Sequence, residues 1–514
     1  MKWVVLMSNI ITIPAEDLNY TSGKQPVHSD PTPEAKPLPK VTIDGKAYEF
    51  KPGDTIMQVA ERYKLHEDIP RYCYHPGMPI AGTCRMCTVE VEKAPKLMTS
   101  CSTPAGDGMV VHTRSEKVLK SRNGVMDFLL TNHPLDCPVC DKAGECELQD
   151  YTFEYGPQES NFKEEKRVFE NATTKKLSDK VTLNMNRCVH CERCVRFTDD
   201  VTKTNDLVMV NRGWHKELMV TDEKVGLVND YQGCLTDFCP VGALTMNDFR
   251  FEKRVWFLDK KPSVCDGCSK GCNIEVHHDK EVVQRYVPIF NEKVNSHWMC
   301  DEGRLSYHTY ADANRIVSPL LPDTASGRLT STNWETAANI VNARVKSASK
   351  VLVVVGTDAT NEEAMLIKGH FSARAEVKYH SGFGENKALD HLLRQSDKTP
   401  NTKGVAAIGL SAMQASDVTG KDLVVVIRQG RAQMPKVEGQ DVILVGVYSR
   451  EEIDTLKASN VRIQAVLPSL ATIEKEGSFT NCDGITQSFT AAVAHRGKAL
   501  ALPKILAALV GEKH

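Results

Sequence analysis

Apolar and polar residues alternate over residues 41–50 on both sides of Asp44-Gly45. Because this dipeptide favours a tight turn between two strands, the pattern predicts a β-hairpin. The spacing becomes helical over residues 55–65, where one face would carry Ile56, Val59, Ala60 and Tyr63. A second helix is predicted over residues 118–131, with its apolar residues roughly on one side: Val118, Leu119, Val125, Phe128 and Leu129.

From about residue 351 the pattern changes to continuous apolar runs, at 351–356, 423–427 and 442–447, separated by helical stretches. Such runs predict a parallel α/β sheet. No glycine-rich fingerprint or phosphate loop follows any of them, so no motif supports a nucleotide site there. No apolar run approaches the roughly 20 residues that span a bilayer, so we expect contact with a membrane only through a partner.

Length and charge narrow the picture a little further. A chain of 514 residues suggests three or four domains. Its 64 Lys and Arg against 66 Asp and Glu give no broad electrostatic bias, so nucleic acid is not an expected partner. The apolar run at the N-terminus is too short for a signal peptide. Residues 14–40 hold six prolines, so residues 1–40 are predicted to be a disordered leader.

The cysteines change the interpretation most, because sixteen of the seventeen lie between residues 71 and 300, in clusters with metal-ligand spacing. This arrangement favours thiolate ligation in a reducing compartment over a secreted disulfide framework. We therefore expect the chain to work in the cytoplasm.

The first group follows the predicted hairpin and helix and comprises Cys73, Cys84, Cys87 and Cys101. Hairpin, helix and cysteine-bearing loop suit a small ferredoxin-type sheet around a 2Fe-2S cluster, although the first gap of ten residues departs from the plant-type spacing. A zinc ion held by the same four thiolates is the alternative.

The second group follows the predicted helix over 118–131 and contains Cys137, Cys140 and Cys146. Three cysteines leave a four-iron cluster one ligand short, and His133 is close enough in the sequence to supply a nitrogen. A neutral imidazole in place of a thiolate should, taken alone, raise the potential of that cluster.

The third group keeps part of a ferredoxin pattern. Bacterial ferredoxins use C-x2-C-x2-C-x3-C-P twice, and the last cysteine of each run serves the cluster of the other run. Here the first run has Thr198 in place of its last cysteine, and the second run keeps only Cys239-Pro240. One complete set remains: Cys188, Cys191, Cys194 and Cys239.

The fourth group, Cys265, Cys268, Cys272 and Cys300, contains Gly267 and Gly271, which suit a tight cluster-binding loop. It is predicted to hold a third four-iron cluster, with structural zinc as the alternative. Cys234 is out of register with the lost ferredoxin run and is interpreted as a spare buried thiol. Cys482 is interpreted as a structural thiol.

The ordered ligand groups resemble the large iron-sulfur subunit, of the bacterial G type, in the peripheral arm of NADH:quinone oxidoreductase, respiratory complex I. The resemblance covers roughly residues 40–310, includes His133, and extends to Cys239-Pro240-Val241-Gly242-Ala243-Leu244-Thr245 and Cys300-Asp301-Glu302-Gly303-Arg304. The fourth group implies a bacterial-type chain.

Beyond residue 310 the chain resembles the molybdopterin oxidoreductase fold, through Ala465-Val466-Leu467-Pro468 and residues 474–481. The region is short for a working molybdenum enzyme. Such enzymes commonly carry a lysine where this chain has Asp301 and Glu302. We therefore expect a scaffold and no molybdenum cofactor.

The resemblance implies an α+β multidomain chain whose function is to relay electrons. Electrons would enter from a flavin-bearing, NADH-binding partner and leave towards quinone-side subunits, at the cytoplasmic side of the bacterial inner membrane. The chain itself would bind neither NADH nor quinone. The expected division is a leader (1–40), a 2Fe-2S ferredoxin-like domain (41–117), three 4Fe-4S domains (118–158, 159–258 and 259–320) and a shortened molybdopterin-oxidoreductase-like α/β domain (321–514).

Two alternatives remain open. One is an electron-transfer subunit of a hydrogenase or formate dehydrogenase complex, which shares the first two ligand groups. The other is a zinc-stabilised assembly protein, which explains the spacings less well.

Overall fold

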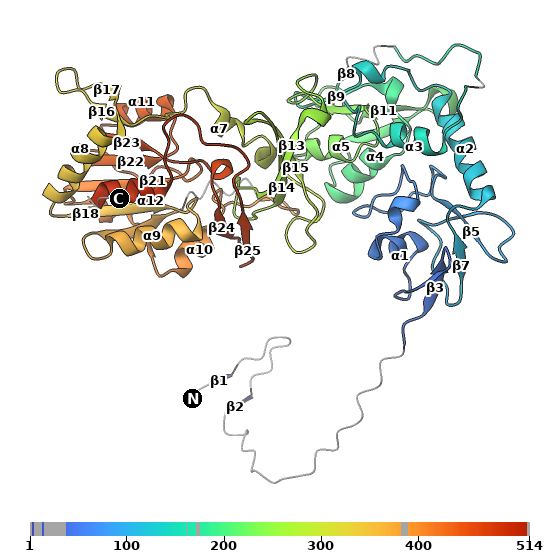
Figure 1. Ribbon diagram of the computed structural model, residues 1–514, viewed down its shortest axis with the longest axis horizontal. Coiled ribbons are helices and arrows are strands. Elements are labelled where there is room, and N and C mark those ends of the chain that lie inside the picture. Colours follow the sequence, from blue (N-terminus) through green and yellow to red (C-terminus); the bar gives the residue numbers. More distant parts are fainter. Residues whose placement is uncertain are drawn as a thin grey trace, which may run out of the picture.

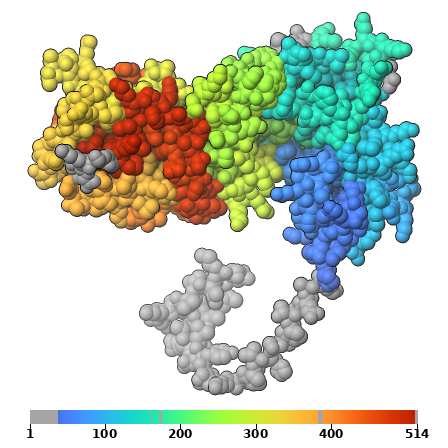
Figure 2. Space-filling model, viewed as in Figure 1, coloured from blue at the N-terminus to red at the C-terminus, as the bar shows by residue number. Residues whose placement is uncertain are grey.

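The computed structural model describes residues 3–4, 13–14, 37–160, 162–170, 175–381 and 389–510. These residues form an elongated body, with the N-terminal sheet and the cysteine-rich segments at one end and a large α/β domain at the other (Figures 1 and 2). Most of the predicted leader lies outside the described residues, which include there only residues 37–40 and the paired strands β1 (Trp3–Val4) and β2 (Ile13–Pro14). In the described part of the chain, no helix has the length and apolar character needed to cross a membrane.

A five-stranded sheet of order β4-β3-β7-β5-β6 forms the N-terminal domain. Its strands are β3 (Lys40–Ile43), β4 (Lys46–Glu49), β5 (Thr88–Val91), β6 (Met98–Thr99) and β7 (Val110–His112), and its helices are α1 (Ile56–Arg62) and the 3-10 turn η2 (His66–Asp68). The predicted hairpin is confirmed, since β3 and β4 pair antiparallel about Asp44 and Gly45, both at positive φ.

Helix α1 confirms most of the second prediction. Thr55 and Gln58 form a capping box at its start, and Ile56, Val59 and Ala60 are fully buried. The assignment of Tyr63 to the buried face was wrong. This residue follows the helix, is 39% exposed, and donates its hydroxyl hydrogen bond to the carbonyl oxygen of Glu49.

Helix α2 (Glu116–Leu130) begins two residues earlier than predicted and buries only part of the predicted face: Val118 is fully buried, and Val125 and Leu129 are partly buried. Leu119 and Phe128 are 38% and 81% exposed, whereas Arg122 and Met126 are fully buried. The reason is that Arg122 donates hydrogen bonds to the carbonyl oxygens of Asp68 and Thr88. The pattern of apolar positions alone could not predict that an arginine lies on the buried face of this helix.

Short elements make up the middle of the chain. They are η3 (Cys137–Val139), α3 (Glu147–Tyr155), β8 (Lys175–Lys176), β9 (Val181–Leu183), η4 (Met185–Arg187), α4 (Arg193–Arg196), the π-helical turn η5 (Phe197–Val201), β10 (Leu207–Val210), η6 (Gly213–His215), β11 (Glu217–Val220), α5 (Gln232–Asp237), β12 (Leu244–Met246) and η7 (Val255–Phe257). An antiparallel sheet of β13 (Asp259–Val264), β14 (Asn273–Asp279) and β15 (Val282–Pro288) follows, and then the short helices α6 (Asp301–Arg304) and α7 (His308–Ala311).

The C-terminal domain contains an eight-stranded sheet of order β17-β16-β23-β22-β21-β18-β19-β20. Its strands are β16 (Leu320–Pro322), β17 (Leu329–Ser331), β18 (Val351–Gly356), β19 (Glu376–His380), β20 (Ser411–Ala412), β21 (Leu423–Arg428), β22 (Asp441–Gly446) and β23 (Arg462–Pro468). The three predicted apolar runs are β18, β21 and β22, which lie side by side and parallel, so the predicted parallel α/β sheet is confirmed.

Both faces of this sheet are covered (Figure 1). Alternate residues of β18 contribute to two separate cores, with Val353 in one and Val354 in the other. This is why the strands read as continuous apolar runs. The other elements of the domain are α8 (Trp334–Ser347), α9 (Asn361–Phe371), α10 (Thr402–Ala407), η9 (Ala415–Val418), α11 (Arg450–Ala458), η10 (Thr472–Glu474), β24 (Gly477–Thr480), β25 (Thr486–Phe489) and α12 (Leu502–Val510).

Candidate iron-sulfur sites

The four cysteines of the first group lie close to one another in the N-terminal domain. Cys73 and Cys84 lie in side-chain contact, as do Cys87 and Cys101, and all four interact electrostatically. Within each pair, a hydrogen bond from the partner lowers the pKa of one thiol, that of Cys73 and that of Cys87. All but Cys84 are buried, so the group forms a water-excluded set of sulfur donors.

The second group is less completely assembled. Cys140 and Cys146 are buried and Cys137 is exposed, and the three thiols interact electrostatically. Burial lowers the pKa of His133 to about 4, although Asp136 acts in the opposite direction, and no cysteine is among the groups that shift it. Its imidazole is therefore neutral near pH 7, the form that binds metals, but its ligation stays a prediction.

The second and third groups approach each other closely at a glycine. A Cβ atom at Gly242 would lie 2.3 Å from the Sγ of Cys140. Gly242 is in the loop after Cys239, so only a residue without a side chain allows the two groups to approach this closely. The amide of Glu147, next to Cys146, also donates to the carbonyl oxygen of Pro240 at 3.0 Å.

The third group lines a small cavity, of about 20 Å³, with all four of its thiols, Cys188, Cys191, Cys194 and Cys239. Burial raises the pKa of the Cys188 and Cys191 thiols to about 12. Thiols in such surroundings ionise only when a nearby positive charge, such as that of iron, compensates.

The backbone around Cys191 is strained. His190 and Glu192, on either side of it, adopt left-handed conformations with φ of 53° and 59°, at a cost of about 1–2 kcal/mol each. The amide of His190 donates to the Sγ of Cys188 at 3.4 Å. Strain of this kind persists where the surroundings require a particular side-chain direction, here that of the three closely spaced sulfurs.

The fourth group lines a second small cavity, of about 10 Å³, with Cys265, Cys268, Cys272 and Cys300. The amides of Gly267 and Gly303 each donate to a cysteine sulfur at 3.4 Å. A Cβ at Gly303 would lie 2.9 Å from the Sγ of Cys265, so glycine is needed at this position for the close approach.

A segment from the C-terminal domain covers this fourth cavity. Leu393, Arg394 and Lys398 line it together with Glu302, and Lys398 donates to Glu302 at 2.6 Å. Lys398 thus reaches the acidic residue Glu302 from almost one hundred residues away, a contact for which the sequence offers no signal.

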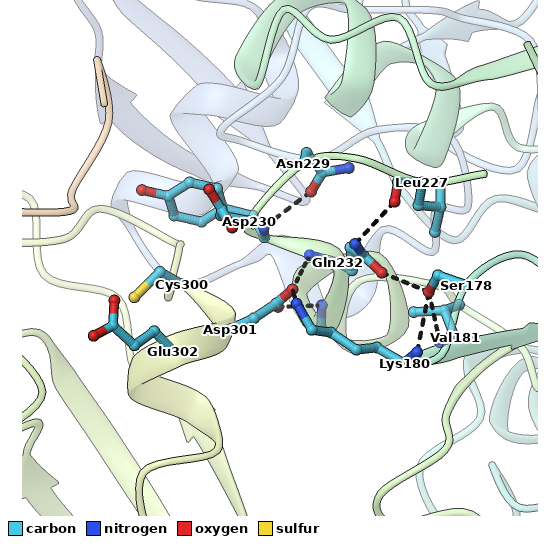
Figure 3. A network of polar contacts seen from close by, with 12 residues as sticks. Ser178, Lys180, Val181, Leu227, Asn229, Asp230, Gln232, Cys300, Asp301 and Glu302 are labelled. Atoms are coloured by element: carbon cyan, nitrogen blue, oxygen red, sulfur yellow. Dashed lines mark hydrogen bonds and ion pairs between the residues drawn. The ribbon is translucent and has the colours of Figure 1, made fainter. Parts of the chain in front are cut away.

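Asp301 holds the third and fourth groups together. Its carboxylate, 2% exposed, accepts hydrogen bonds from the amides of Gln232 (3.1 Å) and Gly233 (2.8 Å) and from the Nζ of Lys180 (3.0 Å). Figure 3 shows Asp301 pointing towards Gln232 and Lys180, while the neighbouring Cys300 and Glu302 point the other way.

At the other end of α5, Arg304 of α6 forms an ion pair with Asp237. We call these contacts, of Asp301 and Arg304 with Gln232, Gly233 and Asp237, the α5–α6 clasp. Helix α5 runs into Cys239 and helix α6 begins after Cys300, so the clasp ties one ligand segment to another.

The two remaining cysteines lie beside these sites. Cys234 is buried in the middle of α5, and its Sγ contacts the carbonyl oxygen of Met299 at 3.2 Å, in keeping with the predicted buried thiol. Cys482 is half-buried, and its amide donates to Ser269. Among the described residues, no three or more His, Cys, Asp or Glu side chains meet in the arrangement of a single-ion site.

Three family models match this part of the chain. Residues 39–116 match a 2Fe-2S iron-sulfur cluster binding domain, residues 122–161 match the NADH-ubiquinone oxidoreductase-G iron-sulfur binding region, and residues 178–245 match the ferredoxin-like domain of NADH-quinone oxidoreductase subunit 3. Domains that bind 2Fe-2S and other iron-sulfur clusters are therefore present, on the segments that carry the first three cysteine groups.

Curated relatives point the same way. The G subunit of NADH-quinone oxidoreductase from Rickettsia bellii is 38% identical over 331 residues, which are 64% of this chain and 47% of that protein. The NADH-ubiquinone oxidoreductase 75 kDa subunit of Reclinomonas americana has the same identity and coverage. The chain spans about half the length of these relatives. A solved NAD+-reducing NiFe-hydrogenase is 26% identical, over 42% of this chain and 91% of that one, with a TM-score of 0.36. The resemblance to the bacterial G-type chain stated from the sequence is confirmed.

Proposed function

We propose that this chain is an electron-transfer subunit of the peripheral arm of NADH:quinone oxidoreductase. It would take electrons from a flavin-bearing partner and pass them, through iron-sulfur clusters, towards quinone-side subunits. The observation that carries the proposal is the gathering of buried thiols into separate sets, three of which lie on segments matched by iron-sulfur family models.

The residues fit the clusters that the proposal requires. The third and fourth cysteine sets each line a cavity with four sulfur donors, with backbone amides directed at some of the sulfurs. We assign one 2Fe-2S cluster to Cys73, Cys84, Cys87 and Cys101. We assign three 4Fe-4S clusters to His133 with Cys137, Cys140 and Cys146, to Cys188, Cys191, Cys194 and Cys239, and to Cys265, Cys268, Cys272 and Cys300.

A bound cluster supplies one-electron redox chemistry, and its potential depends on charge, hydrogen bonds to sulfur and burial. The chain contributes the rest. Buried side chains exclude water, glycines such as Gly242 and Gly303 let loops approach the sulfurs, and the α5–α6 clasp keeps two sets in a fixed relation.

The remaining parts of the proposal concern the surroundings of the chain. We infer the domain division stated from the sequence, a C-terminal domain that keeps the molybdopterin-oxidoreductase scaffold without a molybdenum cofactor, and a place on the cytoplasmic side of the bacterial inner membrane as a peripheral part of the complex. The fourth cluster would lie off the main electron route.

Iron and sulfide analysis of the purified chain, with an anaerobic redox titration followed by EPR, tests the proposal. We expect a brown protein with about 14 iron atoms, from one two-iron and three four-iron clusters. A colourless protein containing stoichiometric zinc would favour the zinc-stabilised alternative, and stoichiometric molybdenum would contradict the proposed scaffold.

A further inference from the structure

Aromatic side chains next to three different cysteine sets meet in one place. His75 follows Cys73 of the first set by two residues, and Phe238 directly precedes Cys239 of the third. Trp298 comes from the fourth set, two residues before Cys300. A fourth ring, that of Phe197, begins η5 just after the helix that carries Cys194.

We call the four side chains of His75, Phe197, Phe238 and Trp298 the aromatic joint. Trp298 is its centre: its ring centroid lies 5.2 Å from His75 in a stacked arrangement and 4.9 Å and 6.1 Å from Phe197 and Phe238 in edge-to-face arrangements. These are the geometries that aromatic pairs prefer. Trp298 is 6% exposed, Phe238 is 8% exposed and Phe197 is fully buried, so three of the four rings are shielded from water, and His75 is half-buried.

A glycine in the first set makes room for the joint. A Cβ at Gly77 would lie 2.8 Å from the ring of Trp298 and 2.8 Å from that of His297. Its φ is not in the left-handed region, so glycine is required here for space and not for its conformational freedom. The loop of the first set is therefore shaped to receive Trp298.

A polar contact reinforces the same junction. Arg196, on α4 of the third set, donates hydrogen bonds to the carbonyl oxygens of Cys73 and Pro79 in the loop of the first set. The contact between the rings of His75 and Phe238 also joins the first set to the third. The first and third sets are thus joined by contacts that involve residues adjacent to their own ligands.

We propose that Trp298 is a positioning residue that fixes the first cysteine set against the third. The inference rests on the proposed function in so far as the sets hold clusters. It gives the fourth set a task that does not require it to carry electrons: the segment that ends in Cys300 delivers Trp298 to the junction of two other sets.

The test compares Trp298→Leu and Trp298→Phe in the full-length, cluster-loaded protein. Trp214→Leu is the control, because Trp214 is 52% exposed and lies outside the joint. The first measurement is hydrogen exchange of the backbone amides of Gly77 and Met78. These amides donate hydrogen bonds to the Nδ1 and to the carbonyl oxygen of His75, respectively. We expect Trp298→Leu to speed exchange at least tenfold, Trp298→Phe to restore it to within threefold, and Trp214→Leu to leave it unchanged.

The second measurement is the magnetic interaction between the reduced first and third clusters, read from EPR relaxation. Trp298→Leu should weaken it at unchanged iron content, and Trp298→Phe should restore it. Unchanged exchange and an unchanged interaction in Trp298→Leu would overturn the proposal. If Trp298→Leu does not fold, Gly77→Ala, which displaces the ring without removing it, decides by the same two measurements.

The failure of this inference can be told apart from that of the proposed function. A wild-type protein without iron would contradict the function, yet the exchange of Gly77 and Met78 would still respond to Trp298→Leu if the joint positions the loop. A fully loaded wild type whose Trp298→Leu variant behaves normally would contradict the joint alone.

Discussion

Replacing Asp301 with alanine should open helix α5 without disturbing its neighbours. The buried carboxylate accepts from two amides of α5 and from Lys180, and alanine would leave both amides without an acceptor. Hydrogen bonds to a charged group contribute about 1.5–3 kcal/mol each, and breaking a buried charged contact from one side costs about 3–5 kcal/mol. We expect a local loss in this second range.

Hydrogen exchange of the amides of Gln232 and Gly233 measures that loss, because local opening controls exchange even in a multidomain chain. With a tenfold change for each 1.4 kcal/mol, exchange should be about 10² to 4 × 10³ times faster in Asp301→Ala. Asp301→Asn keeps one acceptor oxygen and should give an intermediate increase.

Glu302→Ala is the matched control, since the next side chain along is 40% exposed and contacts Lys398, not α5. Exchange in Asp301→Ala within threefold of the wild type would refute the reasoning. An equal effect of Glu302→Ala would do the same.

Three further predictions concern other parts of the chain. Arg315→Ala should leave the charge of Glu474 buried and unpaired, because the two side chains are 2% and 1% exposed, and should cost about 3–5 kcal/mol. Thermal unfolding should then show a Tm lowered by several degrees. The control Glu451→Ala, at an exposed position of α11, should leave the Tm unchanged. His133→Cys adds a negative charge to the second set and should lower the midpoint potential of its cluster in an EPR titration; an unchanged potential would count against ligation by His133. Burial would raise the pKa of Asp441, but Arg462 and Arg344 outweigh burial and lower that pKa below 3.8. The two ion pairs therefore stabilise the folded state above pH 3.8, and this stabilisation is lost as the pH falls through the pKa of Asp441 in the folded protein. Asp441→Asn should reduce this acid dependence of the free energy of unfolding between pH 5 and 2, and parallel curves for the two proteins would contradict the prediction.

Local chemistry explains which elements the sequence could predict. The Asp44-Gly45 turn, the cap at Thr55 and the apolar runs of β18, β21 and β22 each depend on neighbouring residues. The proposed grouping of the cysteines also depends on local sequence, since ligand chemistry imposes characteristic short spacings.

Contacts between distant segments explain what was missed. The buried stripe of α2 contains Arg122 because two carbonyl oxygens far along the chain accept its hydrogen bonds. Lys398 reaches the fourth cavity from the C-terminal domain, and Trp298 reaches the loop of the first set. Nothing in the residues flanking these three side chains distinguishes them from surface or core residues of the same type.

The α5–α6 clasp has a consequence for biosynthesis. Gln232, Gly233 and Asp237 leave the ribosome well before Asp301 and Arg304, which supply their partners from more than sixty residues further along. Until those residues emerge, the helix that leads into Cys239 has unpaired amides and an unpaired carboxylate. We therefore expect the helix before Cys239 to reach its final stability only after synthesis has passed Arg304.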